Sequence, residues 1–221
     1  MDLIEYPDSE MMMMQLTDRL VGEISKCLAA HDHVSLAVPG GTTPGPIFDT
    51  LAGSDLHWDR VHILLTDERR VPADHERSNE RLLRERLLVD KAAAAQFIRL
   101  VPGPGVSIDD LNQRIAPELP LSILLLGMGA DMHCASLFPG SPQLADALAP
   151  KAPNVMEVDA PEGLEPRITL TGPVLRGALS THVIITGEKK REALERARRL
   201  KPGEAPIATV LNEATVHWTK E

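Results

Sequence analysis

The sequence predicts an α/β fold: a single-domain, doubly wound, mostly parallel sheet flanked by helices, in the manner of Rossmann-like proteins. Strand-like and helix-like segments alternate along the 221 residues. The run Leu121–Leu126 is continuously apolar, which is typical of a parallel strand covered on both faces. Several expected strands end in glycine-containing turns, and such turns form the ligand-binding edge of open α/β sheets.

The individual elements follow from capping residues and hydrophobic spacing. Ser9, Ser78 or Asn79, and Ser107 are candidate helix caps. The expected helices run from Ser9 to about Ala30, from Pro44 through Leu51, from Ser78 or Asn79 to about Lys91, onward from Ser107, and over Gly187–Leu200; Met13, Leu16, Leu20, Ile24 and Leu28 form the apolar face of the first. The expected strands are His33–Val38, Val61–Leu65, Phe97–Val101, Leu121–Leu126, Asn154–Val158, Arg167–Leu170, His182–Thr186 and a final edge strand Thr215–Trp218.

Composition limits the class of protein. The length suits one domain over residues 1–221, and 43% hydrophobic residues suffice for a core. We expect no membrane span, since no run of about 18 apolar residues occurs, and the acidic start lacks a signal-peptide layout. The net charge of −9 argues against nucleic-acid binding. Two cysteines, Cys27 and Cys134, indicate no disulfide framework, so a cytoplasmic location is expected.

A glycine-rich segment is the first candidate binding site. Gly40, Gly41, Thr42 and Thr43 follow an expected strand and open an expected helix. Backbone N–H groups at such a position converge on anions, and the two hydroxyls add donors. A phosphate group is therefore a candidate ligand, and a plain tight turn is the alternative. The segment matches neither the Walker loop nor the dinucleotide fingerprint.

Charged residues leave the next expected strand at the same edge of the sheet. Asp67 and Arg69 follow Val61–Leu65 closely. Arg69 is a candidate bidentate clamp for a phosphate. Asp67 is a candidate to orient a hydroxyl group or a histidine. The alternative is a solvated turn.

A histidine follows the central strand. Asp131 and His133 come directly after the turn that contains Gly127 and Gly129. We expect a helix to begin here. A helix N-terminus disfavours imidazolium, so His133 is expected to be neutral and able to accept a proton; a structural histidine is the alternative. Cys134 is a weak candidate nucleophile, because adjacent side chains on a helix diverge.

Two further groups lie outside these turns. Lys190 falls in the first turn of the helix expected after Gly187, where an anionic ligand would offset its unfavourable position against the helix dipole. His31 and His33 flank Asp32 at a helix–strand junction. That spacing is more typical of a turn than of metal ligation, and we expect no metal site.

Four motifs together resemble the 6-phosphogluconolactonases of the oxidative pentose phosphate pathway. They are Gly40–Pro44; Asp67–Arg69 with Val71, Pro72, His75, Ser78 and Asn79; Gly127–Pro139; and Arg167–Thr171 followed by Gly187 and Lys190. They occur in the order of the family and cover roughly residues 35 to 190. This family belongs with the glucosamine-6-phosphate isomerase and deaminase fold group.

The resemblance implies hydrolysis of 6-phospho-D-glucono-1,5-lactone to 6-phosphogluconate by general acid–base catalysis, without a metal or another cofactor. His133 would activate water and then protonate the ring oxygen, and Asp67 or Asp131 would orient His133 or the sugar. The glycine-rich segment would hold the phosphate, with charge from Arg69, Lys190 and Arg167. The implied partner is a small sugar-phosphate lactone, with no nucleic acid or membrane, for a monomer or homodimer.

The chain also departs from the family pattern. Met132 stands where the family usually has glycine, Cys134 where it usually has threonine, and Thr42 where it usually has serine. We expect little strain at Met132, with its side chain on the cavity or its rim. Two alternatives stay open: an isomerase or deaminase of amino-sugar phosphates, which typically carries a glutamate after the histidine, and a non-catalytic sugar-phosphate-binding protein.

Overall fold

A seven-stranded sheet forms the centre of the protein. The computed structural model describes residues 1–101, 106–161 and 163–220. The strands of this sheet are β1 (Asp2–Tyr6), β2 (Val34–Val38), β3 (Val61–Leu65), β5 (Gln96–Ile98), β6 (Ile123–Gly127), β9 (Ser180–Thr186) and β10 (Thr215–Thr219). They lie in the order β1–β10–β9–β6–β2–β3–β5, and each neighbouring pair is parallel. The predicted fold class is therefore confirmed.

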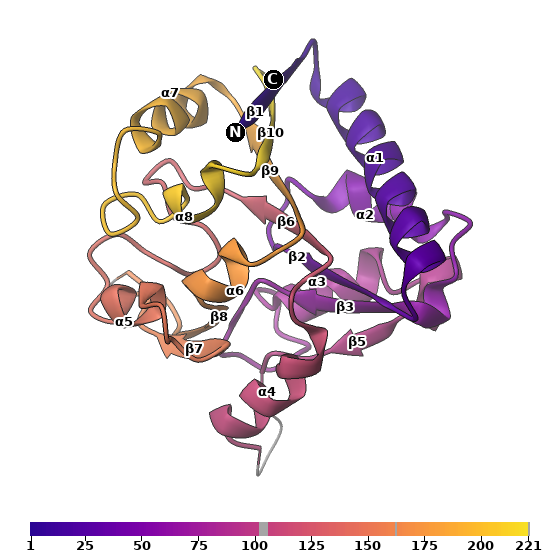
Figure 1. Cartoon of the computed structure of the whole chain (residues 1–221), viewed down its shortest axis with the longest axis horizontal. Helices are drawn as coiled ribbons and strands as arrows, with labels where there is room; N and C mark the ends of the chain where they lie inside the picture. The colour runs from indigo at the N-terminus through magenta and orange to yellow at the C-terminus, as the bar shows by residue number, and fades with distance from the viewer. Residues whose placement is uncertain (102–105, 162, 221) are drawn as a thin grey trace.

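Helices cover both faces of this sheet. They are α1 (Ser9–Ala30), α2 (Gly45–Ala52), α3 (Asn79–Arg86), α4 (Ile108–Ile115), α5 (Leu144–Leu148), α6 (Gly172–Arg176), α7 (Glu188–Ala197) and α8 (Ala208–Leu211), with short 3-10 turns at Trp58–Arg60, Asp90–Ala94 and Ala116–Glu118. Figure 1 shows α1 and α2 on one side of the sheet and α6, α7 and α8 on the other. This division follows from right-handed crossovers that leave the middle of the sheet in opposite directions.

The longest helix buries a single apolar row. Met12, Leu16, Leu20, Ile24 and Leu28 recur every four residues and are all buried. Met13, which was predicted to begin this row, is only partly buried against the core, and Met12 continues the four-residue spacing. The cap also differs by one residue, since Asp8 rather than Ser9 accepts the backbone N–H of Met11. A short polar side chain in extended backbone fulfils the same role at either position.

A second sheet stands beside the first. It contains β4 (Asp67–Arg69), β8 (Arg167–Leu170) and β7 (Val155–Val158), all antiparallel. The last two strands were expected from the sequence, whereas Asp67–Arg69 was expected to form a turn. These charged residues show no strand pattern, and their partner strand lies about 100 residues further along the chain. The pairing places Arg69 opposite Arg167.

Other differences concern the ends of elements. The strand at Thr215 is not at the edge, since β1 pairs along its outer side. The charged helix α3 begins after its Ser78 cap, as expected, but ends at Arg86 instead of about Lys91. The helix α7 likewise ends at Ala197 rather than Leu200. Exposed helix ends carry little hydrophobic signal, so their boundaries depend on tertiary packing.

The order of the strands creates a switch point between β2 and β6. From β2 the chain continues outward through β3 and β5, whereas from β6 it continues the other way through β9 and β10. Loops leaving the carboxyl ends of two such strands diverge and open a crevice for ligands. Over the described residues, no helix is both long enough and apolar enough to cross a bilayer.

Candidate active site

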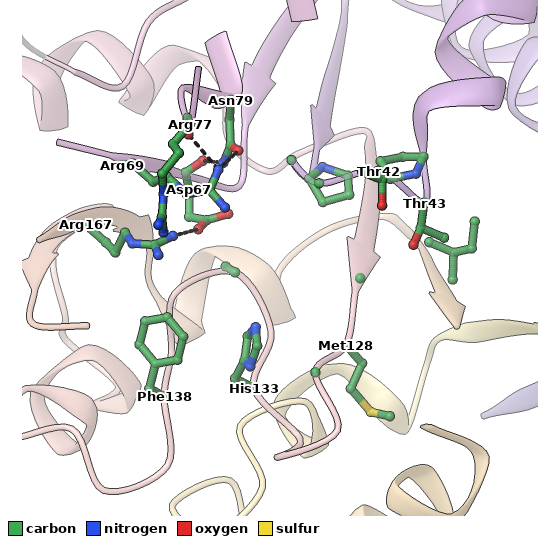
Figure 2. Close-up of a pocket in the computed structure, with 18 of the residues that line it drawn as sticks. Thr42, Thr43, Asp67, Arg69, Arg77, Asn79, Met128, His133, Phe138 and Arg167 are labelled. Carbon is green, nitrogen blue, oxygen red and sulfur yellow. Dashed lines mark hydrogen bonds and ion pairs between the residues drawn. The ribbon is translucent and has the colours of Figure 1, made fainter. Parts of the chain in front are cut away.

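A cavity of about 460 Å³ opens at the carboxyl edge of the large sheet. Loops that follow β2, β3, β6 and β9 line it, so it spans the switch point. Figure 2 shows arginine side chains beside Asp67 on one side, Thr42 and Thr43 on another, and His133 between them. Of the residues selected from the sequence, the lining includes Gly40, Gly41, Thr42, Thr43, Asp67, Arg69, His133, Arg167 and Lys190. Asp131 is not part of the lining and contacts His133 instead.

Glycine is required at Gly40 by a neighbouring side chain. A Cβ atom at this position would lie 2.0 Å from Oδ1 of Asn79. The amide of Asn79 can therefore pack against the loop only because Gly40 has no side chain. This contact ties the glycine-rich loop after β2 to the N-terminus of α3.

The buried carboxylate of Glu68 organises the arginine side of the cavity. It accepts backbone N–H groups from Arg69 at 2.6 Å, Asn79 at 2.8 Å and Glu80 at 2.6 Å, and the Ser78 hydroxyl at 3.1 Å. Burial raises the pKa of Glu68, and these four donors oppose that shift by stabilising the carboxylate. Glu68 thus joins β4 to the first turn of α3.

Arg69 is held in place by neutral acceptors. Its Nη1 donates to the carbonyl of Arg77 and to Oδ1 of Asn79, both at 2.7 Å. The amide of Asn79 in turn donates to the carbonyl of Asp67 at 2.9 Å. Nε of Arg69 is buried and has no hydrogen-bond partner among the described residues. The guanidinium therefore keeps its charge uncompensated by a bonded carboxylate and retains donors for a ligand.

Asp67 contacts a serine and an arginine, not the histidine. Its Oδ2 accepts the hydroxyl of Ser136 at 2.5 Å and lies 4.0 Å from Nη1 of Arg167. Arg167 is 6% exposed, and burial lowers the pKa of its guanidinium from the ordinary value. Of the two carboxylates expected to orient His133 or the sugar, Asp131 is the one that contacts His133. Ser136 was missed, since nothing in the sequence distinguishes it from other loop serines.

The imidazole of His133 is oriented by Asp131. Nδ1 of His133 lies 2.6 Å from Oδ1 of Asp131, whose pKa is lowered mainly by this hydrogen bond. An ionised carboxylate only accepts hydrogen bonds, so Nδ1 carries the proton and Nε2 of the neutral ring is free to accept one. Glycine is needed at Gly129, where a Cβ atom would lie 2.2 Å from Nδ1 of His133.

The predicted helix at His133 is absent. The loop after β6 is instead closed by two backbone hydrogen bonds, from Gly129 to the carbonyl of His133 and from Met132 to the carbonyl of Gly129, both at 3.0 Å. The next helix is α5, which starts at Leu144. The expectation that a helix dipole acts on His133 was therefore wrong, and the charge that faces His133 is the carboxylate of Asp131.

Cys134 is excluded as a nucleophile by burial. Its side chain has no exposed surface, and burial raises the pKa of the thiol to about 12. The reactive thiolate is therefore negligible near neutral pH. A Cys–His nucleophilic pair is therefore excluded, as expected from the divergence of adjacent side chains.

Lys190 lines the cavity from the side of β6 that adjoins β9, opposite the glycine-rich loop after β2. It lies in the first turn of α7, which begins after Gly187 at the end of β9. Burial lowers the pKa of its ammonium group. Among the described residues it has no hydrogen bond or ion pair. An anionic ligand would supply the missing partner.

Several cavity residues were not selected from the sequence. Arg77 was not singled out, yet it lines the cavity and its Nε lies 3.1 Å from Oε1 of Glu165. Phe138 packs against His133, with ring centroids 5.0 Å apart. Asn79 was considered as a helix cap and as part of the family motif, not as a cavity residue. Their roles depend on contacts between distant segments, which leave no local pattern.

Met132 adopts a backbone conformation that favours glycine, with φ 71°. Its side chain is partly buried against the hydrophobic core and does not line the cavity; Met128 does. The prediction that Met132 sits at the cavity rim was wrong. The loop fixes its backbone on both sides, because its N–H donates to Gly129 and its carbonyl accepts from Ile207.

Known proteins resemble this chain in sequence and in fold. A sequence profile of the glucosamine-6-phosphate isomerases/6-phosphogluconolactonase family matches residues 7–218. The chain belongs to this family. It is 34% identical to the 6-phosphogluconolactonase of Rhizobium meliloti (strain 1021), over 99% of this chain and 97% of that protein. It is 38% identical to the 6-phosphogluconolactonase of Caulobacter vibrioides, over 88% and 85% of the two chains.

Solved structures of the family agree with the fold. A 6-phosphogluconolactonase from Shewanella baltica OS155 matches with a TM-score of 0.93 and 29% identity, over 99% of this chain and 97% of that one. A putative 6-phosphogluconolactonase from Neisseria gonorrhoeae FA 1090 matches with a TM-score of 0.88 and 29% identity, over 99% of each chain. The family resemblance predicted from the four motifs is confirmed.

The role of Glu68 is testable by Glu68→Gln. One oxygen becomes an amide nitrogen that cannot accept the N–H donors around it, and an unsatisfied buried group costs roughly 1–3 kcal/mol, more where the lost acceptor is charged. We expect the free energy of unfolding in urea to fall by about 2–3 kcal/mol. The matched control is Glu85→Gln on the exposed side of α3, which should stay within about 0.5 kcal/mol of the parent. Equal stabilities of the two variants would contradict the role of Glu68.

The positive φ of Met132 predicts that the glycine variant at this position is more stable than the alanine variant. Met132→Ala loses side-chain packing and keeps the strained φ, whereas Met132→Gly loses the same packing but relieves about 1 kcal/mol of strain. We therefore expect the glycine variant to be the more stable of the two and to turn over within about tenfold of the parent. Urea unfolding of both variants measures this. Greater stability for Met132→Ala would show that the positive φ carries no strain.

Proposed function

We propose that the chain hydrolyses 6-phospho-D-glucono-1,5-lactone to 6-phosphogluconate, acting as a carboxylic ester hydrolase of the oxidative pentose phosphate pathway. The observation that carries this is the 2.6 Å contact between His133 and Asp131 beside a cavity with three unpaired or partly paired cations, Arg69, Arg167 and Lys190. A base with a free nitrogen and an excess of positive charge suit an anionic ester.

The phosphate group is assigned to the cationic part of the cavity. The loop with Thr42 and Thr43 supplies hydroxyl and N–H donors at the start of α2. Arg69 and Lys190 supply charge, and Arg167 is a further candidate whose charge is shared with Asp67. Desolvated cations bind phosphate tightly because few waters screen the attraction.

His133 is assigned the proton transfers. Nε2 removes a proton from water as the water oxygen attacks the lactone carbonyl carbon, which gives a tetrahedral intermediate with negative oxygen. Collapse of the intermediate breaks the bond to the ring oxygen, and the imidazolium returns the proton to that oxygen. Asp131 keeps the ring in the required tautomer and stabilises the imidazolium. No step uses a metal or another cofactor.

Asp67 and the cations complete the scheme. Ser136 and Arg167 fix the carboxylate of Asp67 at the cavity wall, where it accepts a sugar hydroxyl. The tetrahedral oxyanion is stabilised by backbone N–H groups of the loops or by a cation. We assign the activity to residues 1–221 as one domain, in a cytoplasmic monomer or homodimer that uses no nucleic-acid partner.

The isomerase or deaminase alternative is less well supported. Residues 134–138, which follow His133, contain no carboxylate, and Asp131 and Asp67 already have partners. The non-catalytic alternative predicts phosphate binding without acceleration of lactone opening. An assay with freshly prepared lactone, run with and without protein, separates these alternatives.

The general base is tested by His133→Ala. General acid–base catalysis contributes roughly 10²–10⁴-fold, so kcat should fall by about that factor. The side chain is partly exposed, so the thermal unfolding midpoint should change little. Asp131→Asn, which keeps the size but loses the charge, should give a smaller loss of kcat. Retention of more than about half of the parent rate by His133→Ala would exclude this base.

The phosphate site is tested by Arg69→Ala and Lys190→Ala. Loss of a charge-assisted hydrogen bond should weaken productive binding by roughly 1.5–3 kcal/mol, seen as a higher KM for the phosphorylated lactone. The matched control is Lys189→Ala, at an exposed neighbouring position. Unphosphorylated gluconolactone should be affected little by any of the three changes. Equal losses of activity on the phosphorylated and unphosphorylated lactones would contradict the assignment of the phosphate group to this site.

A further inference from the structure

A second cluster of ionisable side chains lies at the amino edge of the large sheet. His33 immediately precedes β2, His62 is the second residue of β3, and Glu118 ends the 3-10 turn before β6. The catalytic histidine lies at the carboxyl edge, so this cluster is separated from it by the length of the strands. Among the described residues it is the one group of three potential metal ligands whose donor atoms lie within 4.8 Å of one another.

The distances within the cluster suit one small cation. Nδ1 of His62 lies 2.9 Å from Oε2 of Glu118, and Nε2 of His33 lies 3.6 Å from the same oxygen. Tetrahedral zinc with ligands at about 2.0–2.2 Å requires its donor atoms to be roughly 3.3 Å apart. The observed separations lie on either side of that value. For three ligands to meet on one ion, the rings of His33 and His62 turn out of their stacked arrangement so that both ring planes converge on it.

The charge of Glu118 also favours a cation. Its side chain is 7% exposed, and in the described part of the chain its carboxylate contacts only the two imidazoles. The imidazole rings are stacked, with centroids 4.4 Å apart and planes 17° apart. A single divalent ion neutralises the carboxylate without placing a positive charge on both stacked rings.

Rigid backbone positions these three side chains. Ser35, in β2, donates its hydroxyl to the carbonyl of Glu118 at 2.9 Å and exchanges hydrogen bonds with Ser122. Ser35 also pairs in register with His62 across the sheet. A backbone held in this way lowers the cost of ordering a metal site. His33 is 42% exposed, which leaves a path for the ion and for a water ligand.

From these observations we propose that His33, His62 and Glu118 bind one zinc ion at the edge of the sheet opposite the catalytic cavity. Two imidazoles and one carboxylate are a donor set that zinc accepts, with water in the fourth tetrahedral position. The ion joins the starts of β2 and β3 to the segment before β6 and therefore stabilises the fold. Of the two histidines that the sequence analysis considered, His33 belongs to the site and His31 does not.

Zinc titration of the chelator-treated full chain tests this proposal. Calorimetry should show one Zn²⁺ per chain, and cobalt substitution should give the visible absorption of a tetrahedral ion. His33→Gln and His62→Gln should each weaken zinc binding by at least the roughly 10–100-fold that loss of an outer-shell partner costs. In both variants the zinc-dependent rise in the thermal unfolding midpoint should disappear together with zinc binding. Lactone hydrolysis should be equal with and without zinc.

Two controls keep the outcome specific. His31→Gln changes an exposed neighbour and should retain zinc binding. His133→Ala removes the other histidine–carboxylate pair and should also retain it. The proposal is overturned if the parent chain binds no zinc, because His33, His62 and Glu118 would then be joined by hydrogen bonds alone. It is also overturned if His33→Gln binds zinc as tightly as the parent chain does. Loss of zinc binding in His133→Ala would place the ion in the catalytic cavity and overturn it equally.

Discussion

Parallel pairing throughout the large sheet is the constraint on which the site depends. Because every strand runs the same way, the loops after β2, β3, β6 and β9 all emerge at one edge. The reversal of winding between β2 and β6 then separates two of these loops and leaves the cavity between them. A glycine-rich loop, a cation cluster and a histidine that are far apart in sequence therefore surround one volume.

Buried polar contacts convert this arrangement into a defined site. Glu68 gathers four donors and thereby fixes Arg69 and Asn79, while Gly40 admits the Asn79 amide against the loop after β2. On the other side, Asp131 fixes the tautomer of His133 through a contact that only Gly129 permits. The groups that line the cavity are thus held by their neighbours, so less binding energy would be lost in ordering them around a ligand.

The two edges of the sheet carry different chemistry. The carboxyl edge presents excess positive charge and a histidine with a free nitrogen, which suits an anionic ester. The amino edge brings His33, His62 and Glu118 together around a buried carboxylate. Strands of fixed length separate the two groups, so an ion bound at the amino edge, as proposed, would lie away from the carboxyl-edge cavity. This separation allows each edge to be altered independently.

The sequence by itself determined the sheet, most of its strands and nine of the residues that line the cavity. Continuous apolar runs such as Leu121–Leu126 and capping serines such as Ser78 and Ser107 are local signals, because burial on two faces and N-terminal capping act within a few residues. Only the tertiary structure decided that Asp67–Arg69 pairs with Arg167–Thr169, that Ser136 holds Asp67, and that His133 lies in a loop beside Asp131. Those contacts join segments tens of residues apart or depend on a turn with positive φ at Met132. Their free energy comes from how the whole chain packs, which no local pattern records.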